Sequence, residues 1–133
     1  MNPEEKVKML VNEFHYVEST ARAFVEYGCI CPYCGEDLLS SRDSYSSVYI
    51  DHLLPKSKYP DLEWDQRNLV ACCSSCNLMK QELDILDLYK DIDPKNTLDN
   101  KQDLINKVKA SLCERLGYKK KEYMRVTQII RNS

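Results

Sequence analysis

Two cysteine pairs with the same spacing constrain the fold of this chain more than any other feature. Cys31 and Cys34 form one Cys-x2-Cys pair, and Cys73 and Cys76 form the second. Four thiolates in two such pairs can close a tetrahedral zinc site. One structural Zn2+ would then join two segments that are distant in the sequence. We therefore expect Cys31, Cys34, Cys73 and Cys76 to bind this ion together.

The residues between and after the two pairs follow a specific order. Asp51-His52 precedes Pro55, Asn68-Leu69 comes next, and the second pair leads into Asn77 and Lys80. In this order and spacing, Cys31 to about Lys80 resembles the HNH endonucleases, the zinc-stapled branch of the ββα-metal (His-Me finger) nucleases. The resemblance implies an α+β fold with a ββα-metal core that contains the structural zinc.

Asp51 and His52 supply the groups that phosphodiester hydrolysis needs. The reaction requires an activated water, a cation near the phosphate, and alignment of both. An unperturbed imidazole is largely neutral at cellular pH, so His52 can act as the general base. Asp51, next to it at the end of a strand, can point to the opposite side and bind a hard cation through oxygen.

The resemblance adds two asparagines to this site. It implies that Asn77 is the second protein ligand of the catalytic cation, at a position where the family often has His. Oxygen ligands from Asp51 and Asn77 favour Mg2+ or Mn2+. Asn68 is implied to tie the loop that holds the base. Lys80 lies three residues after Asn77, so it can reach a phosphate from the same helical face or simply be solvated.

Periodicity and turn residues predict one domain, residues 1–133. A helix should begin at Asn2-Pro3 and continue past Val25 to Gly28. The zinc-stapled unit should span 29–92, with strands at about 45–50 and 68–72 and a helical stripe from about Ser75 to Tyr89. Two C-terminal helices should occupy 93–133: the first, capped by Thr97, should end at Gly117, and the second should cover about 119–130.

The charge is unevenly distributed along the chain. The net charge is −2, but residues 107–131 contain eight basic and two acidic side chains, an excess of +6, so residues 1–106 carry −8. The basic C-terminal end is the candidate surface for nucleic-acid phosphates, and a solvated helix face is the alternative. The candidate phosphate contacts there are Lys119, Lys120, Lys121 and Arg125.

Several other residues are expected to have structural roles. Cys29 and Cys72 break the pair spacing and read as buried thiols, while Cys113 is expected in the core. His15 lacks a nearby partner in the sequence and is expected to be structural. Trp64 either packs under the loop or stacks on a base.

The sequence has no run of about 18 apolar residues and no signal-peptide layout, so we expect a cytoplasmic protein without a membrane partner.

Two function classes remain open. One is a metal-dependent endonuclease that cuts DNA, with RNA less favoured, using His52 and one divalent cation. The other is a zinc module that binds nucleic acid or protein without cleaving. A redox role for the Cys-x2-Cys pairs is the weaker interpretation, because two matched pairs suit zinc better. No separate recognition motif accompanies the nuclease unit, so a protein partner could supply specificity, and the family resemblance suggests a defence or mobile-element setting.

Overall fold

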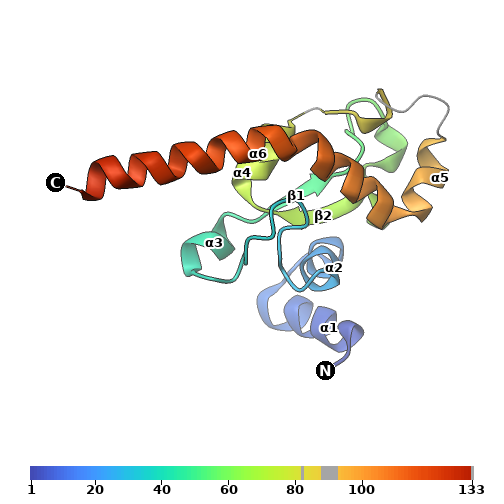
Figure 1. Ribbon diagram of the computed structural model, residues 1–133. Coiled ribbons are helices and arrows are strands. Elements are labelled where there is room, and N and C mark those ends of the chain that lie inside the picture. Colours follow the sequence, from blue (N-terminus) through green and yellow to red (C-terminus); the bar gives the residue numbers. More distant parts are fainter. Residues whose placement is uncertain (82, 88–92, 133) are drawn as a thin grey trace.

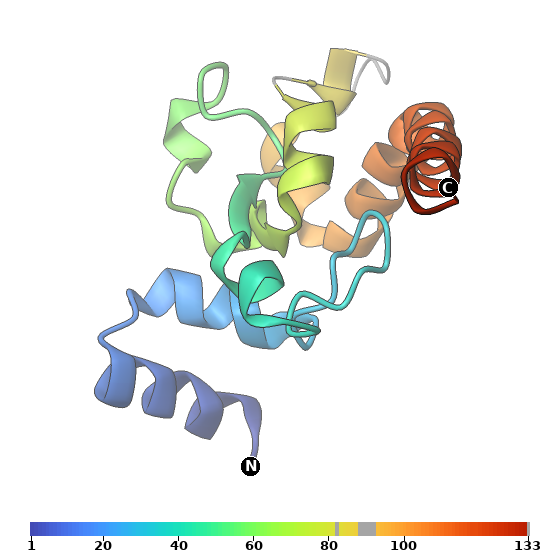
Figure 2. The same cartoon turned by 90° about the vertical axis from the view of Figure 1, so that its left-hand side faces the viewer.

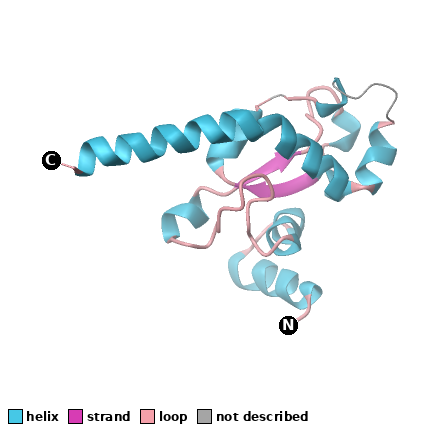
Figure 3. Ribbon diagram, in the orientation of Figure 1, coloured by secondary structure: helices cyan, strands magenta, loops and turns pink. Residues whose placement is uncertain are grey.

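A two-stranded antiparallel sheet followed by a short helix lies at the centre of the computed structural model, which describes residues 1–81, 83–87 and 93–132. Strand β1 (Tyr49–His52) pairs with β2 (Leu69–Cys72), with Asp51 opposite Val70. Helix α4 (Ser74–Lys80) begins directly after β2. This β-β-α order, drawn in Figure 3, is the predicted core of the α+β fold.

Both strands differ slightly from their predicted bounds. The first was expected at about 45–50, but the short helix α3 (Arg42–Ser46) occupies the start of that segment and β1 starts at Tyr49. Ser41 caps α3 by accepting a hydrogen bond from the Ser44 amide, which favours a helical turn there. As a result, Asp51 and His52 lie within the strand, on opposite faces of it.

The N-terminal segment forms two helices where one was predicted. Helix α1 (Pro3–Phe14) is capped by Asn2 and ends at His15, which adopts the left-handed conformation with φ 58°. Helix α2 (Glu18–Glu26) then folds back beside α1, as Figure 2 shows, and also contacts β2. The apolar spacing continues across the turn because both helices bury a face. Periodicity alone therefore could not reveal the break.

The two C-terminal helices are present, but the break between them is at Asn100 instead of Gly117. Helix α5 (Pro94–Asp99) contains Thr97, so Thr97 is not the cap of the long helix. Helix α6 (Lys101–Arg131) is capped by Asn100 and continues through Gly117. Cys113, expected in the core, is exposed on α6. The second part of α6 extends past the rest of the molecule (Figure 1), and we call residues 117–131 the α6 arm.

Among the described residues, three 3-10 turns connect the remaining elements: η1 (Pro60–Leu62), η2 (Gln66–Asn68) and η3 (Ile85–Asp87). The predicted helical stripe from Ser75 stops at Lys80, because Gln81 takes φ 44° and ends α4. Tyr89, its expected last member, lies outside the described residues.

The apolar core joins the zinc-binding loops, the sheet and the first part of α6. Its largest fully buried apolar side chains come from the zinc loop, the loop after β1, β2, η3, α5 and α6, and they are Tyr33, Leu38, Leu53, Leu54, Val70, Ile85, Leu98, Leu104, Ile105, Val108 and Leu112. Within the described ranges, none of the helices has the length and apolar character that a bilayer crossing requires.

Candidate active site and metal centre

The four predicted zinc ligands meet in space. The Sγ atoms of Cys31, Cys34, Cys73 and Cys76 all lie within 4.8 Å of one another. Cys34 Sγ and Cys73 Sγ are 3.7 Å apart. A tetrahedral ion with zinc–sulfur bonds of about 2.3 Å places its sulfurs about 3.8 Å apart, whereas a disulfide would require about 2.05 Å. The four cysteines therefore fit one zinc ion.

Backbone geometry holds each pair in the form of a knuckle. Gly35 has φ 81°, a conformation that favours glycine, and its amide donates to Cys31 O. In the second pair, the Cys76 amide donates to Cys73 Sγ at 3.3 Å, so that Cys73 caps α4. Zinc binding would therefore fix the start of α4 and the position of Asn77, the residue after the last ligand.

The thiol cluster favours a bound cation electrostatically. Hydrogen bonds from Cys34, Cys73 and Cys76 lower the pKa of Cys31, so one thiolate forms readily. Hydrogen bonds with Cys31, Cys34 and Cys73 raise the pKa of Cys76, because its thiol keeps the proton that it donates, and burial and the negative charge of Cys31 add to this effect. A dication removes this conflict by neutralising part of the charge.

Asp51 lies on the buried face of β1 and has two partners there. It is 7% exposed. Tyr33 Oη donates to Asp51 Oδ2 at 2.7 Å, and Lys80 Nζ lies 3.3 Å from Oδ2 and 3.4 Å from Oδ1. Burial raises the pKa of Asp51, and the positive charge of Lys80 opposes that effect. The ammonium thus supplies the counter-charge for this buried carboxylate.

The predicted phosphate contact of Lys80 is wrong for this structure. Lys80 is 2% exposed, and its Nζ donates to His52 O at 2.8 Å as well as contacting Asp51. Lys80 ends α4, and its side chain reaches inward to the strand instead of outward to solvent. A buried ammonium needs such oxygen partners, and they are available only because β1 packs beside α4.

His52 is half-buried on the other face of β1 and is oriented by one hydrogen bond. Its Nε2 lies 3.0 Å from Glu63 O. A carbonyl oxygen can only accept, so Nε2 carries the proton in the neutral ring and Nδ1 keeps the free lone pair. Trp64, the next residue along this loop, is exposed, so its predicted packing under the loop is not seen.

Asn68 ties the loop between the strands. It is fully buried, its Oδ1 accepts from the Leu54 amide at 2.8 Å, and its Nδ2 donates to Leu54 O and Leu62 O. These bonds fix the segment after His52 against the segment before Glu63. They fit the loop-tying role that the resemblance implied, and they place Asn68 beneath the surface, away from a substrate.

A cleft of about 450 Å3 brings Asp51, His52 and Asn77 together. Asn77 lines it from the middle of α4. Lys56 and Gln81 also line the cleft. The predicted basic residues lie elsewhere, because Lys119, Lys120, Lys121 and Arg125 are exposed along the α6 arm. The structure therefore unites the predicted acid, base and amide, and separates them from the predicted phosphate contacts.

Tyr33 is the residue near this site that sequence reasoning missed. It lies between two predicted zinc ligands in the chain, is fully buried, and donates a hydrogen bond to Asp51. Its position inside the Cys31 to Cys34 pair was the available signal. That signal places Tyr33 near zinc but does not give the distance to Asp51.

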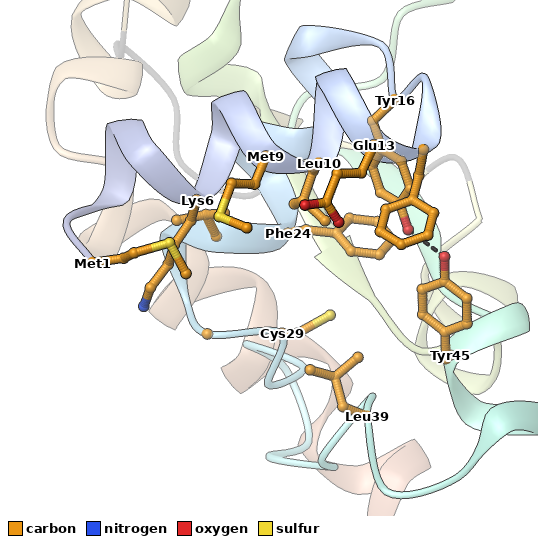
Figure 4. Close-up of a pocket in the computed structure, with 13 residues that line it drawn as sticks. Met1, Lys6, Met9, Leu10, Glu13, Tyr16, Phe24, Cys29, Leu39 and Tyr45 are labelled. Atoms are coloured by element: carbon orange, nitrogen blue, oxygen red, sulfur yellow. Dashed lines mark hydrogen bonds between the residues drawn. The ribbon is translucent and has the colours of Figure 1, made fainter.

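A second hollow, of about 410 Å3, lies between α1, α2 and the segment that contains α3 (Figure 4). Its lining is mostly apolar and includes Met9, Phe24 and Leu39, and the hydroxyls of Tyr16 and Tyr45 hydrogen-bond at one side. None of the predicted site residues lines it.

Comparison with known proteins agrees with this geometry. Residues 31–82 match the sequence model of a family described as HNH endonuclease. No curated protein and no solved structure matches the chain. The matched segment begins at the first zinc ligand and contains both strands, α4 and every residue of the Asp51, His52 and Asn77 cleft. Over residues 31–82, this chain is therefore similar to the HNH endonuclease family.

Proposed function

We propose that this protein is a metal-dependent endonuclease that hydrolyses phosphodiester bonds of DNA. The observation that carries the proposal is the cleft in which Asp51, His52 and Asn77 meet within the segment that is similar to the HNH endonuclease family. A carboxylate, an imidazole with a free Nδ1 and an amide on one concave surface are the groups that hydrolysis requires.

His52 is the general base in this proposal. Its Nε2 donates to Glu63 O, which keeps the ring oriented and leaves Nδ1 as the nitrogen that can accept a proton from a water. When Nδ1 takes a proton from that water, the Glu63 carbonyl continues to accept from Nε2 and stabilises the imidazolium. The hydroxide formed at Nδ1 is then available to attack phosphorus.

Asp51 and Asn77 are the protein ligands of the catalytic cation in this proposal. Their oxygens come from adjacent elements, β1 and α4, and both residues line the cleft. An all-oxygen pair fits Mg2+ or Mn2+ better than softer metals. When bound there, the cation neutralises charge on the phosphate and on the leaving oxygen.

The α6 arm is the proposed grip on the DNA backbone. Its exposed basic side chains are Lys119, Lys120, Lys121 and Arg125. Of these four, only Lys119 forms an ion pair with an acidic side chain among the described residues, and its partner is Glu122. The part of α6 that precedes the arm is joined to α4, the helix that carries Asn77, because Arg115 donates to Met79 O. A protein partner that adds sequence specificity remains part of the proposal.

One observation favours a second candidate, a zinc module that binds without cleaving. Lys80 already neutralises Asp51, so the buried carboxylate has a structural partner even without a divalent cation. In that case Asp51 would only stabilise the folded protein, and the zinc-binding unit would bind nucleic acid or protein without cleaving it.

Cleavage assays separate the two candidates. Zinc-loaded protein is incubated with supercoiled plasmid, linear duplex, single-stranded DNA and RNA, with Mg2+ or Mn2+ either omitted or added. Omission is preferable to a chelator, because a chelator would also remove zinc. Cleavage that requires the added cation and is lost in Asp51→Asn and Asn77→Ala proteins is expected. Absence of cleavage on every substrate, with native zinc content, would favour the binding module.

A further inference from the structure

Tyr33 connects the zinc centre to the cation-binding carboxylate of the proposed active site. Its hydroxyl donates to Asp51 Oδ2 at 2.7 Å, the shortest contact that Asp51 makes among the described residues. Tyr33 is fully buried and lies between the ligands Cys31 and Cys34. Because a zinc ion would fix Cys31 and Cys34 on either side of it in the chain, and because its side chain is fully buried, the phenol would have little freedom to move and its hydroxyl would be a fixed donor.

The contacts of Asp51 are unequal on its two oxygens. Oδ2 accepts from Tyr33 and lies 3.3 Å from Lys80 Nζ, whereas Oδ1 has only the longer 3.4 Å contact with Lys80. Asp51 lines the cleft, but neither Tyr33 nor Lys80 is among the described residues that do so. Both partners therefore approach Asp51 from its buried side, and Oδ1 is the oxygen with capacity left for a ligand in the cleft.

We propose that Tyr33 is a positioning residue for the divalent cation: its hydroxyl anchors Asp51 Oδ2 so that Oδ1 is presented to the cleft. This inference rests on the proposed function, because it assumes that Asp51 binds a cation. The argument is one of pre-organisation. A carboxylate held by a fixed donor loses little rotational freedom when a metal binds, and hydrogen-bonded partners of metal ligands commonly change metal affinity by 10- to 100-fold.

Tyr59 offers a matched control for the chemical change. Its hydroxyl donates to Asp84 Oδ2 at 2.8 Å, and Asp84 is also buried and lies 3.5 Å from a lysine, Lys58. Tyr59 does not line the cleft. Tyr33→Phe and Tyr59→Phe therefore remove the same oxygen from the same kind of contact, one beside the proposed cation ligand and one away from it.

The test measures Mn2+ binding to the full zinc-loaded chain by electron paramagnetic resonance, without DNA. We expect Tyr33→Phe to weaken Mn2+ binding by about tenfold, and Tyr59→Phe to leave it unchanged. In an Asp51→Asn background, Tyr33→Phe should have no further effect, because the carboxylate through which it acts has been replaced. Site-specific replacement Tyr33→4-aminophenylalanine keeps a donor at the same place and should restore most of the affinity.

Equal Mn2+ affinity in wild-type and Tyr33→Phe proteins would overturn the inference. So would an equal loss in Tyr33→Phe and Tyr59→Phe, which would indicate general loosening. If Tyr33→Phe loses zinc, the protein with Tyr33→4-aminophenylalanine is the one to measure. If that protein keeps native zinc content but binds Mn2+ about ten times more weakly than wild type, the proposed role of the donor is also overturned. Cleavage is scored separately, so a protein that binds Mn2+ at Asp51 but cuts nothing would contradict the proposed function and leave this inference standing.

Discussion

Only Nδ1 of His52 remains for proton transfer, because Nε2 is hydrogen-bonded to Glu63 O. His52→Ala removes the acceptor but little packing, since the ring is only half-buried. We expect strand cleavage to fall by about a hundredfold or more, because general-base catalysis contributes on that scale. Zinc content and melting temperature should stay native. Plasmid nicking, elemental analysis and thermal denaturation measure the three quantities.

His15 provides the control for this change. It is exposed, ends α1 and has φ 58°, a conformation that Asn tolerates well. His15→Asn should therefore keep both cleavage and stability. Full activity in repurified His52→Ala protein would contradict the assignment of the base.

Lys80 should contribute to stability more than to substrate binding. Lys80→Met keeps the aliphatic stem but leaves Asp51 buried without its counter-charge, so the free energy of unfolding should fall by about 3 kcal/mol. Lys107→Met, in an exposed pair with Asp103, should change it by less than about 0.5 kcal/mol. Urea denaturation measures both. A Lys80→Met protein with native stability and weakened DNA binding would instead restore the predicted phosphate contact.

The residues of the candidate site could be predicted to different degrees. Spacing was enough for Cys31 and its three partners, because two matched pairs have few alternative uses. The inward orientation of Lys80 and the contact of Tyr33 with Asp51 could not be predicted in this way. Both depend on which side of β1 packs against α4 and the zinc loop, and no local pattern specifies that.

At the scale of elements, the errors concern where helices break. Apolar periodicity predicted a single helix to Gly28, yet the chain reverses at His15. The glycine at position 117 predicted the end of another helix, yet α6 continues through that residue. A glycine stops a helix only when the backbone must leave the helical conformation there. In α6 the residues on both sides of Gly117 are good helix formers, and the cost of one glycine is small.

Gly117→Ala tests the continuity of α6. A Cβ at this position would meet nothing within 4 Å. Alanine should therefore raise stability by about 0.5–1 kcal/mol through its higher helix propensity and its less flexible unfolded chain. Thermal denaturation, with helix content followed by circular dichroism, measures the effect.

Gly35→Ala is the opposite case and serves as the control. Space is also free around Gly35, but its φ of 81° is strained for alanine. This change should destabilise the protein by about 1 kcal/mol and weaken zinc retention. A loss of stability in Gly117→Ala as well would indicate that α6 does not continue through residue 117.

At the scale of the molecule, the four-cysteine centre joins the zinc loops to the sheet and α4. Cys73→Ser should lower the melting temperature strongly and reduce zinc content, because metal binding and folding are coupled in such sites. Cys113→Ser changes an exposed thiol outside the cluster and should affect neither quantity. A native melting temperature in Cys73→Ser protein would refute a structural role for zinc.

The single-domain interpretation stays a prediction. A single cooperative unfolding transition of the whole chain would support it.

The α6 arm is the proposed contact with phosphates. Replacing Lys119, Lys120 and Lys121 together by Gln should weaken DNA binding for any sequence, and flatten the plot of log affinity against log salt by roughly one unit per lost contact. Lys6→Gln with Lys8→Gln, on α1, should leave that slope unchanged. Titrations at several salt concentrations measure it, and an unaltered slope in the triple variant would exclude phosphate contact by the arm.

The global layout was only partly predictable. The separation of a basic end from an acidic remainder is visible in the sequence, because charges can be counted. That the basic residues would lie on a helix projecting from the molecule was not visible. It depends on Leu104, Ile105, Val108 and Leu112 packing into the core while the large apolar side chains after Leu116 stay exposed.

The length of α6 sets a footprint on DNA. Arg115 donates to Met79 O on α4, the helix that carries Asn77, and Arg131 ends α6 sixteen residues later. At 1.5 Å per residue this is about 24 Å, or about seven base pairs at 3.4 Å each. A protein that cuts in the cleft and grips along α6 would therefore protect DNA asymmetrically. The protected region would extend about seven base pairs to one side of the scissile bond. The shortest duplex that is cut efficiently would need to be longer on that same side.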